Sequence, residues 1–207
     1  EKNKNLTFFS NVSGAVNLAR ATKLSGKKYV FISSACIFES KDLNDIKNEF
    51  SKPNPACFYA ETKAMAEKLI KEIDSDTLIF RIRLPLSEVP HPRNTINKLL
   101  TYNKIQTNQE SVTVMEDAIP VMIDLIEKKE IGVFHLINEG TISPDEIADL
   151  FGHPHEKVSK ESMDSMMALQ NRARRVTTYA TSLRVPMLPN IKTRVVELVK
   201  KYKEYAS

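Results

Sequence analysis

Phe58-Tyr59-Ala60-Glu61-Thr62-Lys63 opens the segment that decides the fold. From Tyr59 onward, apolar and charged residues recur at the spacing of an amphipathic helix, which puts Tyr59 and Lys63 on one face, a single turn apart. Residues 28–34 before it form an apolar run without the polar alternation of a half-exposed sheet, and residues 77–84 after it are typical of a second apolar strand. This order predicts an α/β fold with a parallel sheet, in which ligands bind beyond the carboxyl ends of the strands.

The rest of the chain continues the alternation of helices and strands more loosely. Ser143 followed by Pro144 and two acidic residues is typical of a helix start, and Gly152 is typical of a helix end. The segment 153–175 has no decisive periodicity. We expect further helices at 5–23, 95–104, 116–128, 144–151 and 191–205, and strands at 112–115 and 132–138.

Composition narrows the class of protein. The 207 residues are 42% hydrophobic, and no apolar run approaches the ~20 residues of a membrane-spanning helix, which favours a soluble cytoplasmic protein without a membrane partner. The net charge is +4, and the basic residues are mixed with acidic ones along the chain. This pattern indicates no nucleic-acid partner. Cys36 and Cys57 fit no metal-ligand spacing, and we expect no metal site.

Tyr59 and Lys63 together suggest proton-transfer chemistry. A free phenol loses its proton near pH 10, so a tyrosine acts as an acid or base at neutral pH where a nearby cation stabilises its phenolate, and Lys63 is placed to be that cation. On its own, Tyr-x-x-x-Lys more often marks an ordinary helix face, and the motif becomes informative only with its structural context.

That context comes from a resemblance. Asn11-Val12-Ser13-Gly14-Ala15, then Ile32-Ser33-Ser34-Ala35-Cys36-Ile37-Phe38, then Tyr59-x-x-x-Lys63 resemble, in this order, the extended short-chain dehydrogenase/reductase superfamily. The runs 58–65, 81–85, 92–98 and 138–140 are similar to its nucleotide-rhamnose 3,5-epimerase/4-reductase group, the dTDP-4-dehydrorhamnose reductase-like proteins. The resemblance covers nearly the whole chain.

The resemblance implies a reductase site. Tyr59 would be the general acid that protonates the C4 oxygen of a 4-ketosugar as hydride arrives from NADPH, or alternatively NADH. Lys63 would lower the pKa of Tyr59 and hold the nicotinamide ribose, and Ser34 would hydrogen-bond the same substrate oxygen. Asn11 matches an asparagine that supports a water relay behind the lysine and would assist cofactor binding, although a polar residue that bonds its own helix is an equal alternative.

The resemblance also implies an epimerase. The superfamily members that epimerise 4-ketosugars resemble this chain in Ser-x-Cys, and a thiolate near cations can remove a proton α to the carbonyl. Cys36 would be that base, unless it is only a small buried hydrophobe. Lys98 is favoured as the acid on the opposite face, and His91, near the position of a histidine in the fucose-forming enzymes, is the other candidate.

Further residues are implied in substrate binding. Arg93 and Asn94 would contact the phosphates or the sugar. Arg172 matches an arginine that binds the diphosphate as a bidentate partner. Because Arg174 and Arg175 are close by in the sequence, either of them could instead be the matching residue.

The chain differs from the group in one respect. Members of the group bind the cofactor pyrophosphate with a Gly-x-x-Gly-x-x-Gly turn, and the 5 glycines of this sequence form no such pattern. We therefore expect residues 1–84 to be the latter part of an NAD(P)-binding Rossmann domain whose first part lies before Glu1, and the chain alone not to hold NADPH. Residues 85–207 would be mainly a smaller α/β substrate-binding lobe, with some segments returning to the sheet.

The function that these motifs predict is NADPH-dependent epimerisation and 4-keto reduction of a nucleotide-linked 4-keto-6-deoxyglucose to nucleotide-L-rhamnose. Two alternatives stay open: a non-catalytic nucleotide-binding or regulatory protein on the same fold, and an epimerase/reductase like GDP-fucose synthase. The sequence does not specify the nucleotide base, and a homodimer is an expected assembly.

Overall fold

A three-stranded parallel sheet forms the centre of the molecule. The computed structural model describes residues 3–170, 172 and 174–206. In it the strands lie in the order β1-β2-β6 and all run parallel, as expected from the sequence. Their bounds are β1 Val30–Ser34, β2 Leu78–Ile82 and β6 Gly132–His135. The α/β prediction is confirmed, and β6 shows that a segment well beyond residue 84 joins this sheet.

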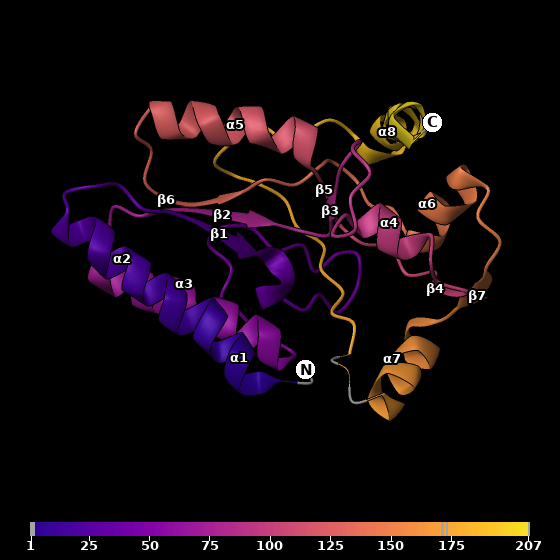
Figure 1. Cartoon of the computed structure of the whole chain (residues 1–207), viewed down its shortest axis with the longest axis horizontal. Coiled ribbons are helices and arrows are strands. Elements are labelled where there is room, and N and C mark those ends of the chain that lie inside the picture. The colour runs from indigo at the N-terminus through magenta and orange to yellow at the C-terminus, as the bar shows by residue number, and fades with distance from the viewer. Residues whose placement is uncertain (1–2, 171, 173, 207) are drawn as a thin grey trace.

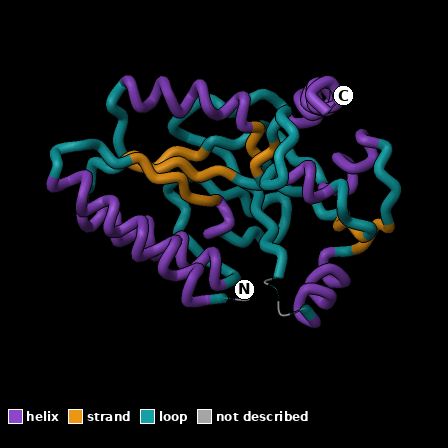
Figure 2. The backbone as a smooth tube through the Cα atoms, viewed as in Figure 1, coloured by secondary structure: helices purple, strands orange, loops and turns teal. Residues whose placement is uncertain are grey.

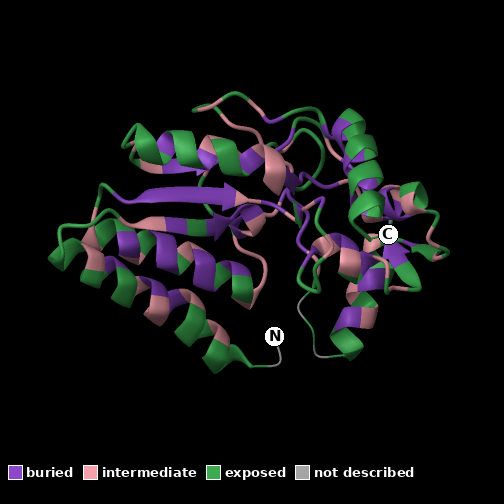
Figure 3. Ribbon diagram, turned by 45° about the horizontal axis from the view of Figure 1, so that its top comes forward, coloured by how far each residue is buried: buried purple, intermediate pink, exposed green. Residues whose placement is uncertain are grey.

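Helices cover both faces of the sheet (Figure 1). One face carries α1 Lys4–Phe8, α2 Gly14–Leu24 and α3 Phe58–Ile73, and the other carries α5 Met115–Glu127. Successive residues of β2 explain this layering, because side chains alternate between the faces of a strand. Ile79 packs in a cluster with α2 and α3, whereas Phe80 packs in a cluster with α5. Figure 3 shows the buried strands between helices whose outer faces are exposed.

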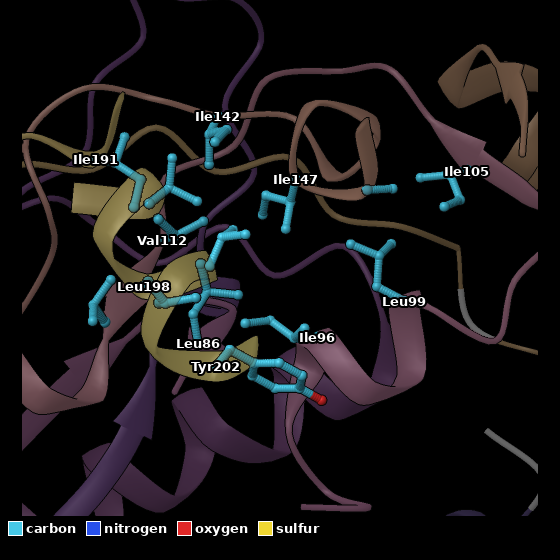
Figure 4. Packing of buried hydrophobic residues seen from close by; sticks show 14 residues of the cluster. Leu86, Ile96, Leu99, Ile105, Val112, Ile142, Ile147, Ile191, Leu198 and Tyr202 are labelled. Atoms are coloured by element: carbon cyan, nitrogen blue, oxygen red, sulfur yellow. The ribbon is translucent and has the colours of Figure 1, made fainter. Parts of the chain in front are cut away.

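A second hydrophobic core lies beside the carboxyl ends of the strands. It is built from α4 Thr95–Leu99, α6 Pro144–Phe151 and α8 Ile191–Ala206, together with the pair β3 Pro85–Leu86 and β5 Thr113–Val114. Figure 4 shows Leu86, Ile96 and Leu198 packed within this cluster near Tyr202. The division of the chain at residue 84 stays a prediction.

The helix boundaries follow local signals where those signals are strong. Ser143 accepts a hydrogen bond from the Glu146 amide while the Glu146 side chain accepts one from the Ser143 amide, so α6 begins with a capping box. It ends at Gly152, which has a φ of 70°. Both ends lie where the sequence predicts them.

Two segments differ from expectation. The helix expected over 95–104 ends at Leu99, and the last residue of that range, Lys104, begins β4 Lys104–Gln106, which pairs with β7 Glu156–Val158. The segment 153–175, which has no decisive period, contains β7 and then α7 Lys160–Leu169. Residues 171 and 173 lie outside the described residues.

The loop after β1 and the segment that leads to α8 run side by side next to the sheet. Figure 2 draws both as loop. The amide of Ser40 donates to the Thr177 carbonyl, and a parallel bridge joins Lys47 to Ala180. These contacts hold the loop after β1 against the segment that leads to α8.

Among the described residues, no helix is long and apolar enough to cross a membrane. The same residues contain no group of three or more His, Cys, Asp or Glu side chains placed to hold a metal ion.

Candidate active site

The site forms where β1 and α3 meet. Ser34 is the last residue of β1, and its side chain caps a short 3-10 helix, Ala35–Ile37, by accepting a hydrogen bond of 3.1 Å from the Cys36 amide. This turn changes the chain direction at the carboxyl end of the sheet. Cys36 then lies at the wall of a cavity of about 460 Å³.

Tyr59 lies in the first turn of α3 and lines the same cavity. Burial raises the pKa of Tyr59 above 10.0, negative charge at Cys36 adds to this rise, and the hydrogen bond with Ser34 and the charge of Arg83 oppose it. The lowered pKa expected from Lys63 is therefore not what the structure shows. A raised pKa keeps the phenol protonated at neutral pH, which is the form that a general acid needs.

Lys63 points to the middle of β1. Its Nζ atom donates to the Ile32 carbonyl at 2.8 Å and lies 4.2 Å from the centre of the Phe31 ring. Burial lowers the pKa of Lys63, and the charge of Glu67 opposes this. An ammonium has three donors, so after the bond to Ile32 it keeps two for another acceptor, such as a ribose hydroxyl.

Asn11 contacts α3 and not its own helix. Its Nδ2 atom donates to the Thr62 hydroxyl at 3.0 Å, beside Lys63 in the chain. Asn11 lies in a π-helical segment, Phe9–Ser13, which separates α1 from α2, and such segments are frequent at functional sites. Among the described residues, this bond to α3 is the contact that the Asn11 side chain makes, and its role in a water relay stays a prediction.

Arg83 is a site residue for which the sequence predicts no role. Its Nη1 atom lies 3.1 Å from the Cys36 sulfur, and its Nη2 atom donates to Glu110 at 2.6 Å. Burial alone would lower the pKa of Arg83, but the negative charges of Cys36 and Glu110 raise it. Arg83 follows β2 and Cys36 follows β1, so the pairing of these strands explains why the two meet.

Cations gather on the cavity wall. Arg172, Arg174, Arg175 and Lys98 all line it. Arg174 is already engaged, because it forms two hydrogen bonds of 2.5 and 2.7 Å with Glu39. Arg175 forms no ion pair within the described residues. Burial lowers its pKa, and the nearby cations Arg172 and Arg83 contribute to the lowering.

Three predicted residues next to α4 do not line this cavity, and Ser34, Lys63 and Asn11 are not among its lining residues either. Asn94 is buried as the N-cap of α4, where it accepts from the Ile96 amide and donates to the Ser87 and Val89 carbonyls. These bonds give Asn94 a capping role, and its contact with substrate stays a prediction. Arg93 and His91 are exposed in the loop before α4, and the Arg93 amide donates to the His91 ring.

Comparison with known proteins fits this arrangement. The family model described as the RmlD substrate binding domain matches residues 1–178. The chain belongs to this family.

Relatives of this RmlD-family chain include enzymes of rhamnose synthesis. It is 32% identical over 158 residues to the trifunctional UDP-glucose 4,6-dehydratase/UDP-4-keto-6-deoxy-D-glucose 3,5-epimerase/UDP-4-keto-L-rhamnose-reductase RHM1 of Arabidopsis thaliana. That match covers 73% of the chain but 24% of the plant protein, so the chain spans about a quarter of its length.

Solved structures also match the RmlD-family fold. The L780 UDP-rhamnose synthase of Acanthamoeba polyphaga mimivirus superposes with a TM-score of 0.77 at 28% identity, over 92% of this chain and 70% of that one. The dTDP-4-dehydrorhamnose reductase of Bacillus anthracis, solved in complex with NADP, superposes with a TM-score of 0.74 at 20% identity, over 100% of this chain and 74% of that one. At that lower identity the second likeness shows the fold alone.

The residues present fit one end of a nicotinamide cofactor. Tyr59 and the free donors of Lys63 are the groups that can hold a nicotinamide ribose. Pyrophosphate usually binds to a Gly-rich turn between a strand and a helix, and none of the five glycines lies in such a turn: Gly14 begins α2, and the other four lie in loops or begin β6.

Proposed function

We propose that this chain contains the epimerase and reductase site of a protein that converts a nucleotide-linked 4-keto-6-deoxyglucose into nucleotide-L-rhamnose. One observation supports this most: Tyr59, Cys36 and Lys98, which are an acid, a base and a second acid, line one cavity. The family and the named activity of the plant and viral relatives agree with it. The cytoplasmic location and the homodimer stay predictions from the sequence.

Reduction at C4 uses Tyr59 and Ser34. A bound NADPH, or alternatively NADH, supplies the hydride to C4. The Tyr59 hydroxyl gives its proton to the C4 oxygen as that oxygen gains negative charge, and Ser34, already hydrogen-bonded to Tyr59, donates to the same oxygen. Lys63, whose ammonium also donates to the Ile32 carbonyl, holds the ribose side of the cofactor.

Epimerisation at C3 and C5 uses Cys36 and Lys98. The Cys36 thiolate takes the proton from the carbon next to the carbonyl, an S–H bond forms, and the C–H electron pair moves into an enolate with its charge on the C4 oxygen. The Lys98 ammonium then protonates the same carbon from the opposite face, the carbonyl re-forms, and solvent restores both groups. Ser34 and Tyr59 stabilise the enolate oxygen in between.

The nucleotide diphosphate binds to the cations of the cavity wall. Arg175 is the main partner that we assign, because it is partly buried and forms no ion pair within the described part of the chain. Arg172 is exposed and adds a second charge. Arg174 contributes less, since Glu39 already neutralises it. The position of His91 in an exposed loop disfavours the fucose-type variant of the mechanism.

The test uses the full-length protein. Incubation of UDP-4-keto-6-deoxyglucose, and in parallel its dTDP analogue, with NADPH or NADH should give nucleotide-L-rhamnose, identified by NMR of the product. Tyr59→Phe is the matched control and should abolish cofactor oxidation. Binding of a nucleotide sugar without turnover by the wild-type protein would instead support the regulatory alternative.

A further inference from the structure

We propose that Arg83, held in place by Glu110, is the positioning residue that stabilises the thiolate form of Cys36 and fixes its sulfur at the cavity wall. This inference rests on the proposed function, because it explains how the epimerisation base becomes active. It assigns a role to a residue pair that the reductive chemistry of Tyr59 does not use.

The contact between Arg83 and Cys36 is direct. The distance of 3.1 Å between Nη1 and the sulfur is within hydrogen-bonding reach, and both residues line the same cavity. Cys36 is only partly buried, so its sulfur has access to the cavity, whereas Arg83 is 5% exposed. A guanidinium at this distance stabilises a thiolate far more than a thiol, because the thiolate is a charged acceptor.

Arg83 cannot turn away from Cys36 without breaking other bonds. Its Nη2 atom donates both to Glu110 at 2.6 Å and to the Val176 carbonyl at 2.5 Å. Glu110 is fully buried and accepts further bonds from the Asn108 side chain and the Thr178 amide. Glu110 is therefore a fixed anchor for one edge of the guanidinium, and the other amino group is left to contact the sulfur.

Charge balance in the site also favours the thiolate. Glu110 balances the positive charge of Arg83. Arg175 lies close enough to Arg83 for the two positive charges to repel each other. Buried charge is costly when it is uncompensated, so a negative sulfur in contact with Arg83 lowers the free energy of the site. The Nε atom of Arg83 is buried without a hydrogen-bond partner in the described structure, so this guanidinium keeps one more donor.

The chemical consequence concerns proton removal at C3 and C5. A thiol with an ordinary pKa near 8.5 is mostly protonated at neutral pH and is a poor base. The Arg83 guanidinium, 3.1 Å from the sulfur, stabilises the thiolate that forms the S–H bond with the substrate proton and leaves the C–H electron pair in the enolate. Without Arg83, the same step first requires the loss of a proton from the sulfur to water.

The test measures the sulfur itself, without substrate. In full-length protein carrying Cys57→Ser, so that Cys36 is the cysteine followed within this chain, the rate of Cys36 alkylation by iodoacetamide is recorded against pH by mass spectrometry of the Cys36 peptide. Arg83→Gln should move the midpoint of this profile upward by one pH unit or more and slow alkylation at pH 7 about tenfold or more, since an opposite charge in contact shifts a pKa by ~1–3 units. Arg83→Lys, which keeps the charge, should restore a large part of the lower midpoint.

Two further measurements keep the result interpretable. Arg83→Gln leaves Glu110 buried without its partner, so the double variant Arg83→Gln/Glu110→Gln is measured beside it, and circular dichroism checks that both fold. The double variant should also show the upward midpoint, because the guanidinium is the group in contact with the sulfur. An unchanged alkylation profile in folded Arg83 variants would overturn the inference and make the contact simple packing.

The failure of this inference and the failure of the proposed function give different results. A shifted alkylation profile in a wild-type protein that exchanges no substrate protons would support the role of Arg83 and reject the epimerase. Proton exchange in the wild-type protein, with an alkylation midpoint that Arg83→Gln does not move, would keep the epimerase and reject the role of Arg83.

Discussion

Single residues of the site can be predicted from the sequence where their neighbours are local. Ser34, Cys36, Tyr59 and Lys63 lie within two short motifs, and a strand end followed by a helix start suffices to place them together. Arg83 and Glu110 cannot be paired in this way, because 27 residues separate them and neither belongs to a periodic pattern. The capping role of Asn94 is not predicted, because an asparagine before a helix and an asparagine that binds substrate look alike in a sequence.

Arg175 allows a sharp test of substrate binding. We expect Arg175→Gln to raise the KM for the nucleotide sugar by roughly 10- to 150-fold, because a charge-assisted hydrogen bond contributes ~1.5–3 kcal/mol. Arg174→Gln is the matched control and should raise KM less, since Glu39 already engages that guanidinium. Steady-state kinetics with varied substrate decide between them, and equal effects of the two changes would refute the assignment of Arg175.

At the scale of elements, the sequence predicts those with strong periodicity or strong caps. The sheet strands, α3, α6 and α8 lie close to their expected positions, with Ile191, Val195, Leu198, Val199 and Tyr202 of α8 all buried. The sequence does not predict the pair β4 and β7. Strands of three residues are too short to show a period, and these two strands lie far apart in the chain. Pro120 lies inside α5, which begins at Met115.

The capping box of α6 predicts a stability effect. Ser143 is 1% exposed, and its hydroxyl and amide bond Glu146 at the helix start. Ser143→Ala should lower the free energy of unfolding by about 1 kcal/mol, measured by urea denaturation. Ser159→Ala, which removes the exposed cap of α7, serves as the comparison and should cost no more than that. A neutral Ser143→Ala would mean that α6 does not depend on this cap.

At the scale of the whole molecule, a buried polar network joins the sheet to the loops around it. Arg81 on β2 forms a salt bridge of 2.6 Å with Glu67 on α3 and contacts the His135 ring on β6. Glu49, from the loop after β1, accepts bonds from the His135 amide and from the Ser182 hydroxyl. The sequence does not predict this network. A charged residue in a buried strand needs polar partners, and these partners lie in other elements far along the chain.

This network predicts a pH dependence of stability. Burial, and then the charge of Arg81, lower the pKa of His135 from 6.5 to about 4. Between these values the unfolded chain binds the proton and the folded one does not, so stability is fully present above pH 6.5 and is lost as pH falls toward 4. We expect the free energy of unfolding to fall by up to about 1.4 kcal/mol per pH unit in this window.

Urea denaturation at pH 7.0, 6.0 and 5.0 measures this slope. His135→Asn removes the titrating group and should flatten it, even if the variant is less stable at every pH. The same slope in wild-type and variant would show that other groups cause the pH dependence.

The central claim is that one cavity contains two separable chemistries, reduction at Tyr59 and proton exchange at Cys36. It is tested most directly by following deuterium incorporation at C3 and C5 of the ketosugar in deuterated solvent, beside cofactor oxidation, in full-length wild-type, Tyr59→Phe and Cys36→Ala proteins. We expect Tyr59→Phe to lose cofactor oxidation by ~10²–10⁴-fold while it still incorporates deuterium, and Cys36→Ala to lose deuterium incorporation by a similar factor. Undiminished incorporation in Cys36→Ala would contradict the account and leave Cys36 as a packing residue beside a simple reductase.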